Sequence, residues 1–124
     1  MLVVRVESPR IAAEWNNNMQ AFVEGLGQGI PVNISSDPRN ETRAWAEYNA
    51  GSGGKISLWP SPLGLAATFD PELVEKFGRI ASAEYRALGI ATALSPQIDL
   101  ATEPRWNRFY GTFGEDPDLD TDMA

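Results

Sequence analysis

Charged and aromatic side chains gather in two segments of this 124-residue sequence. Asp37 and Arg39 directly follow the apolar run Ile30–Ile34, which is typical of a buried β-strand. A longer polar segment follows a second such run, Ile90–Leu94; it holds Asp99, Glu103, Arg105, Trp106, Arg108 and Tyr110. In parallel α/β folds, the loops after the carboxyl ends of strands carry the functional groups. We therefore expect these two segments to lie at one edge of a sheet.

A carboxylate, an arginine and an aromatic ring together suit the binding of a polyol. A carboxylate accepts hydrogen bonds from adjacent hydroxyls, a guanidinium donates to others, and an aromatic face covers the ring. A plainer interpretation makes Asp37 a turn residue and pairs Arg105 and Arg108 with Glu103 and Asp99. Both interpretations remain open at this point.

Three tryptophans are considered for packing or for ligand stacking. Trp15 lies on a helical apolar stripe, so we predict that it belongs to the core. Trp106 is expected to pack rather than to stack on a ligand, because large aromatic side chains mostly fill cores. Trp59, beside Pro60, fits either role.

The composition excludes several classes of function. The chain has no Cys and no His, so disulfides, thiolate sites, cysteine nucleophiles and histidine-based catalysis are excluded, and acid–base chemistry would fall to carboxylates. We expect no cofactor and no metal. A net charge of −7 disfavours nucleic acid and anionic membrane surfaces as partners. No apolar stretch approaches the ~20 residues of a membrane span, and the opening residues 1–6 do not form a signal peptide, so we expect a soluble protein of unassigned compartment.

Strands and helices are predicted to alternate along the chain. Leu2–Val6 is β-prone, and Ser8-Pro9 opens a helix that the glycines from Gly25 onward end. Asp70-Pro71 opens a second helix that stops at Gly89 and places these residues on one side: Leu73, Phe77, Ile80, Ala81, Glu84, Tyr85 and Leu88. Asp116-Pro117 opens a third. Ser35 to Asn40 is predicted to be a polar loop. The alternation predicts one α/β domain over residues 1–124 with parallel strands.

Two other motifs are better explained by a structural role than by a functional one. Gly51–Gly54 lacks the Gly-Lys-Ser/Thr of a phosphate loop, so it is expected to be a flexible connection. The alternating Asp118, Asp120 and Asp122 lack the central Gly and distant Glu of a calcium loop. We interpret them as a solvated helix start.

Long, ordered motifs resemble one known family. Four stretches are similar to the N-terminal catalytic domain of glycoside hydrolase family 3. They are residues 63–74 and 84–90, the run Glu103-Pro104-Arg105-Trp106-Asn107-Arg108 and the run Gly111–Pro117. The upstream segments 29–32 and 35–39 fit as well. The resemblance covers roughly residues 11–124. Gly111 and Asn40 depart from the family pattern, which often has Glu and commonly has His at these places.

The resemblance implies a partial, truncated (β/α)8 TIM-type barrel from a retaining, β-glucosidase-like enzyme that hydrolyses O-glycosidic bonds. Asp37 matches a carboxylate that binds sugar hydroxyls, and Arg108 matches an arginine that holds the same sugar; a nucleophilic role for Asp37 is the lesser alternative. The family's nucleophile and acid/base lie on later strands, so we assign no catalytic residue here. Retaining hydrolysis needs two carboxyl groups about 5 Å apart.

We therefore expect a fragment with a carbohydrate partner and no hydrolase activity of its own. Uncovered barrel edges are expected to make the isolated chain self-associate. The alternatives are a non-catalytic carbohydrate-binding module and a small flavodoxin-type interaction domain.

Overall fold

Three short parallel strands form the sheet of the protein, in the order β1-β2-β3. The computed structural model describes residues 1–3, 6, 8–37, 40 and 55–124. The strands are β1 (Leu2–Val3), β2 (Ser35–Ser36) and β3 (Thr92–Ala93). Leu2 pairs with Ser35, and Ser35 pairs with Thr92, both in parallel register. The predicted parallel arrangement is confirmed.

The predicted limits of the second strand were wrong. Only Ser35–Ser36 pairs in the sheet, where a polar loop was expected, and Ile30 is 69% exposed. The Gln20 side chain accounts for the shift: it accepts a hydrogen bond from the Val32 amide at 3.0 Å and donates to the Val32 carbonyl at 2.7 Å. Val32 therefore pairs with a helix side chain, whereas the Asn33 carbonyl accepts from the Met1 amino group at 2.6 Å. Ile34 itself is fully buried, as predicted for this apolar run.

The third predicted strand is shorter than expected as well, whereas the first can be judged only at its described residues. Leu2–Val3 pairs, Val6 is buried, and residues 4–5 lie outside the described part of the chain. In the run Ile90–Leu94, only Thr92–Ala93 pairs; Ile90 is buried, but Leu94 is 50% exposed. The run is thus buried at its start and open at its end.

The helices begin with a cap residue followed by proline. They are α1 (Pro9–Glu24), α2 (Pro62–Ala66), α3 (Pro71–Ala87) and α4 (Pro117–Met123), with a short 3-10 helix η2 (Phe109–Gly111) before α4. The caps Ser8, Ser61, Asp70 and Asp116 each accept a hydrogen bond from an amide in the first turn. The predicted starts of α1, α3 and α4 are confirmed. Helix α2 was not predicted, although Ser61-Pro62 carries the same signature as Ser8-Pro9.

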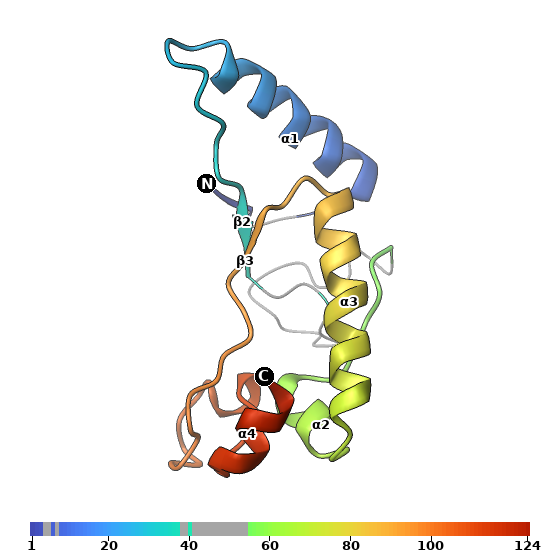
Figure 1. Cartoon of the computed structure of the whole chain (residues 1–124), viewed down its shortest axis with the longest axis vertical. Coiled ribbons are helices and arrows are strands. Elements are labelled where there is room, and N and C mark those ends of the chain that lie inside the picture. The colour runs from blue at the N-terminus through green and yellow to red at the C-terminus, as the bar shows by residue number, and fades with distance from the viewer. Residues whose placement is uncertain (4–5, 7, 38–39, 41–54) are drawn as a thin grey trace.

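Helix α3 runs from the strands to α2 and α4 (Figure 1), and its residues belong to two separate apolar clusters. Near the sheet, its Tyr85 and Leu88 pack with Val6, Ile34, Ile56 and Ile90. Towards its start, Val74 packs with Leu65, Ala66, Phe113 and Met123 of α2, the loop before α4, and α4. One helix therefore holds both the strands and the segment that follows β3.

The prediction that Trp15 belongs to the core was wrong. Trp15 is 49% exposed, and Ile11 and Phe22 on the same helix are 58% and 64% exposed. Helix α1 faces the body of the protein through Asn16, which is 2% exposed and donates to the Leu88 carbonyl at 2.6 Å. The apolar stripe of α1 thus lies next to the buried face instead of on it.

The chain is an α/β protein, as predicted. Its described strands form one open three-stranded sheet, which by itself neither closes a barrel nor makes the five-stranded sheet of a flavodoxin-type fold. Among the residues that can be described, no helix has the length and apolar character needed to cross a membrane.

Candidate sugar-binding site

Asp37 follows β2 directly and is fixed through its backbone. The Tyr85 hydroxyl on α3 donates to the Asp37 carbonyl oxygen at 2.7 Å, and the Ser36 hydroxyl lies 3.1 Å from the same oxygen. Ser36 is fully buried, and its hydroxyl also lies 3.3 Å from the Val3 carbonyl oxygen of β1. Asp37 is half-buried at the carboxyl edge of the sheet. Arg39 lies outside the described residues.

A polar network continues the loop beyond Asp37. The Asn40 amide nitrogen, in a residue that is 3% exposed, donates to a Glu84 carboxylate oxygen of α3 at 2.6 Å. The Ser57 amide donates to the other Glu84 oxygen at 2.9 Å, and the Ser57 hydroxyl donates to the first at 2.8 Å. The Trp59 indole N–H donates to the Ser57 hydroxyl oxygen at 3.1 Å. The Asn40 side chain therefore points towards α3 and links residue 40 to Ser57 and to that helix.

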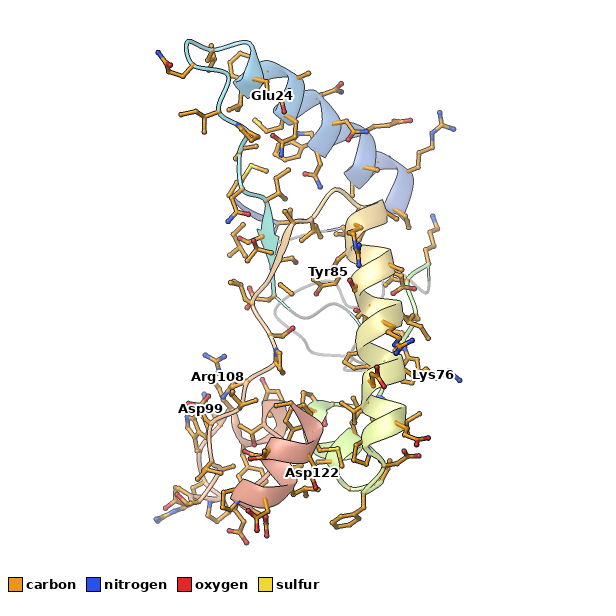
Figure 2. All side chains as sticks on the ribbon, in the orientation of Figure 1. Glu24, Lys76, Tyr85, Asp99, Arg108 and Asp122 are labelled. Atoms are coloured by element: carbon orange, nitrogen blue, oxygen red, sulfur yellow. The ribbon has the colours of Figure 1, made fainter. Side chains whose placement is uncertain are left out.

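The segment after β3 is anchored at points on both sides of its charged residues. The Ala101 amide donates to the Gly114 carbonyl at 2.8 Å, and Ala101, Thr112 and Phe113 are buried. Between these anchors, Arg108 is exposed and donates to the Gln97 side-chain carbonyl at 2.9 Å. In Figure 2, Arg108 and Asp99 both lie in this loop, below β3. The structure thus presents Arg108 to solvent from a loop with a buried base.

Of the two predicted ion pairs, only one is present. Arg105 binds Glu103 through two contacts of 2.7 Å and 2.8 Å, and this pairing with the guanidinium lowers the pKa of Glu103 to about 2. Arg108 has a neutral partner, Gln97, and makes no ion pair with Asp99 or any other carboxylate in the described part of the chain. The charge of Arg105 is therefore paired with a carboxylate, whereas that of Arg108 is not paired with any carboxylate in the described residues.

The tryptophans next to these loops differ in their surroundings. Trp59 is partly buried and its ring centroid lies 5.4 Å from that of Phe77, at an interplanar angle of 57°. It belongs with the second apolar cluster, so the packing role is the one the structure supports. Trp106 is half-buried on the loop that carries Arg108.

The sheet register relates the two predicted binding residues. Ser36 pairs with Ala93, so Asp37 and the segment leading to Arg108 both leave the sheet at its carboxyl edge. A hollow of about 770 Å³ lies between α3, the segment 90–96 and the end of α4; Asn40 and Tyr85 line it, but neither Asp37 nor Arg108 does. Its walls are mainly apolar, which suits packing better than hydroxyl recognition. No cluster of metal-ligating side chains is present among the described residues.

Known proteins that resemble this chain identify its family. The sequence profile of the glycosyl hydrolase family 3 N-terminal domain matches residues 5–124. The chain belongs to glycosyl hydrolase family 3. Two relatives are similar over nearly the whole chain. A periplasmic beta-glucosidase/beta-xylosidase of Dickeya chrysanthemi is 53% identical over 118 residues, which is 95% of this chain, and beta-glucosidase C of Emericella nidulans is 46% identical over 114 residues, which is 90% of it.

The family 3 relatives are much longer than this chain. It spans 18% of the length of each of the two named above. The solved structure of M tuberculosis LpqI superposes with a TM-score of 0.63 over 98% of this chain and 40% of that chain. At 22% sequence identity, this likeness concerns the fold alone.

Sequence reasoning missed the side chains that hold the Asp37 loop. Glu84 and Tyr85 were assigned only to the apolar side of α3. A carboxylate among apolar residues was the available signal, because a buried charge requires partners. The partners of Glu84 are Asn40 and Ser57, and the partner of Tyr85 is the Asp37 carbonyl; all lie far away in sequence, so spacing alone could not identify them.

Proposed function

We propose that this chain is part of the N-terminal (β/α)8-type barrel of a retaining, β-glucosidase-like glycosidase, and that it supplies part of the sugar-binding subsite through Asp37 and Arg108. The parallel pairing of β2 with β3 supports the proposal most directly. Because of this pairing, the segments that bear Asp37 and Arg108 both leave the sheet at its carboxyl edge. In this fold type, that edge is where substrates bind.

The two side chains have complementary roles in this proposal. The Asp37 carboxylate accepts hydrogen bonds from adjacent sugar hydroxyls, and the Arg108 guanidinium donates to hydroxyls of the same ring. Tyr85 and Ser36 bind the backbone carbonyl of Asp37, so its place is set without using its carboxylate. The neutral partner of Arg108 leaves that cation uncompensated by any described carboxylate.

The chain by itself is proposed to bind sugar without hydrolysing it. Retaining hydrolysis needs a nucleophile and an acid/base about 5 Å apart. The positions matched to the family supply binding groups but neither of these carboxyl groups. A barrel of this type takes about 250 residues, and this chain has 124.

A glucose titration followed by calorimetry or NMR tests the binding role. Asp37→Asn and Arg108→Ala should each weaken binding about tenfold or more, since hydrogen bonds to charged groups contribute roughly 1.5–3 kcal/mol. Arg79→Ala is the matched control, because Arg79 is an exposed arginine on α3 that pairs with Glu75. Equal affinities for all four proteins would refute the assignment.

An assay with a chromogenic aryl β-glucoside tests the absence of turnover. We expect no hydrolysis above background at high protein concentration. Hydrolysis that Asp37→Asn abolishes would instead make Asp37 a nucleophile and overturn the proposed binding role.

A further inference from the structure

Two consecutive residues of α3 reach across to the loop that begins at Asp37. Figure 2 places Tyr85 on the face of α3 that is turned towards the strands. Its hydroxyl donates to the Asp37 carbonyl, while the neighbouring Glu84 binds Asn40 and Ser57. Helix α3 therefore binds Asp37 and Asn40, which lie on either side of positions 38–39, and both contacts come from one turn of the helix.

Glu84 is surrounded by hydrogen-bond donors. Its carboxylate accepts from the Asn40 side-chain amide at 2.6 Å, the Ser57 main-chain amide at 2.9 Å and the Ser57 hydroxyl at 2.8 Å. A carboxylate is the one common side-chain group of this size that only accepts. Three donors converging on two oxygens thus require a charged acceptor here, and a neutral amide would turn a donor of its own towards them.

Tyr85 combines anchoring with packing. The residue is 7% exposed, and its ring belongs to the apolar cluster under the sheet with Leu88 and Ile90. The ring therefore fixes the position of the hydroxyl oxygen, and with it the place of the Asp37 carbonyl, 2.7 Å away. Removing only the hydroxyl would keep the packing and remove the hydrogen bond from α3 to the Asp37 carbonyl.

We propose that Glu84 and Tyr85 are positioning residues for the sugar-binding loop, fixing Asp37 for hydroxyl recognition while touching no substrate themselves. This inference rests on the proposed function of Asp37. It adds that helix α3, by clamping residues on both sides of positions 38–39, sets the affinity of the site. A purely structural role would affect the melting temperature without changing sugar affinity in the folded protein.

The test compares Tyr85→Phe and Glu84→Gln with the parent chain. Glu75→Gln is the control, because Glu75 is an exposed glutamate on the same helix whose described partner is Arg79. Glucose affinity is measured well below the melting temperature, and thermal melting is recorded for each protein. We expect about three- to tenfold weaker binding in both variants, the range that one hydrogen bond represents, with cooperative melting retained and the control unchanged.

Amide hydrogen exchange provides a readout that needs no sugar. The Ser57 amide bonds to Glu84 directly, and the Trp59 amide bonds to the Asn40 carbonyl. Both amides should exchange at least about tenfold faster in Glu84→Gln than in Glu75→Gln, because a lost hydrogen bond lowers local protection. The NMR resonance of the Asp37 carbonyl carbon should shift in Tyr85→Phe.

Each outcome decides a different point. Affinities within twofold of the parent in both variants would overturn the positioning role. If the parent itself does not bind glucose, the proposed function fails, and the exchange rates alone decide whether Glu84 fixes the loop: unchanged rates refute this, and faster rates support it. If Glu84→Gln does not fold, Tyr85→Phe, which keeps its ring in the cluster, carries the test.

Discussion

Asp120 is predicted to lower the stability of the folded chain. It is 6% exposed, and neither of its carboxylate oxygens has a hydrogen-bond partner among the residues that the structure describes. Its neighbours on α4, Leu119 and Met123, pack into the second apolar cluster. Burying a polar group without a partner costs roughly 1–3 kcal/mol. Asp120→Ala should therefore stabilise the protein.

The size of the effect follows from three contributions. Removing the unpaired carboxylate gains roughly 1–3 kcal/mol, and alanine adds about 0.5 kcal/mol through its helix propensity. Losing a negative charge near the start of a helix costs about 0.3–1 kcal/mol. The net gain is about 0.5–3 kcal/mol, or roughly 2–10 °C in melting temperature for a domain of this size.

The gain should depend on pH. Burial, and secondarily the charge of Asp116, raises the pKa of Asp120 above its ordinary value of 3.8. The folded state then binds this proton more tightly than the unfolded state, so the parent loses stability as pH rises from 3.8 through the raised pKa. The difference between Asp120→Ala and the parent should accordingly be larger at pH 7 than at pH 4.

Thermal melting at the two pH values is the assay, with Asp118→Ala as the control. Asp118 is exposed on the same helix, so its replacement should leave the melting temperature nearly unchanged or slightly lower. A melting temperature of Asp120→Ala at or below that of the parent at pH 7 would refute the reasoning. A gain that is the same at both pH values would refute the part based on the pKa.

Three further predictions concern two glycines, the exposed surface of α1 and the ion pair between Arg105 and Glu103. Gly89→Ala should lower stability by about 1–3 kcal/mol, because Gly89 has φ +77° and an added Cβ would lie 3.0 Å from the Asn16 Cβ. Gly78 lies inside α3 with open space around it, so Gly78→Ala should raise stability by up to about 1 kcal/mol. Denaturant unfolding of both variants measures these changes. The exposed apolar stripe of α1 should make the parent self-associate, so Trp15→Ser with Phe22→Ser should shift the sedimentation profile towards monomer while Asn17→Ser does not; a parent that is monomeric at all concentrations would contradict this. Arg105→Gln should raise the pKa of Glu103 from about 2 towards 4.5 in an NMR titration, and an unchanged pKa would show that the ion pair does not form in solution.

Local signals in the sequence predicted the helices well. The Ser-Pro and Asp-Pro starts of α1, α3 and α4 fix helix caps through contacts within three residues, which the sequence contains completely. Helix α2 carried the same signal and was overlooked. The end of α3 at Gly89 was equally local, since its positive φ favours glycine.

Features that depend on distant residues could not be predicted in the same way. The shift of β2 to Ser35–Ser36 depends on Gln20, which binds the backbone of Val32 from α1. The exposure of Trp15 depends on which side of α1 contacts the Leu88 carbonyl, a contact that Asn16 makes across 72 positions of sequence. Periodicity identifies a stripe on a helix, but not which of two adjacent stripes is covered.

The same distinction between local and distant contacts applies to the candidate site. Asp37 and Arg108 were identified from motifs and from their places after apolar runs, and the shared sheet edge was predicted from parallel pairing. The polar network of Glu84, Asn40 and Ser57 was not, because its members lie 17 to 44 positions apart in sequence.

The most direct test of the account is an NMR titration of the isotope-labelled chain with glucose, read residue by residue. We predict that the largest shift changes fall on the loops that carry Asp37 and Arg108, with little change along α1. Changes confined to the hollow between α3 and α4, or no changes at saturating sugar, would contradict the claim that these two loops form a common sugar-binding site.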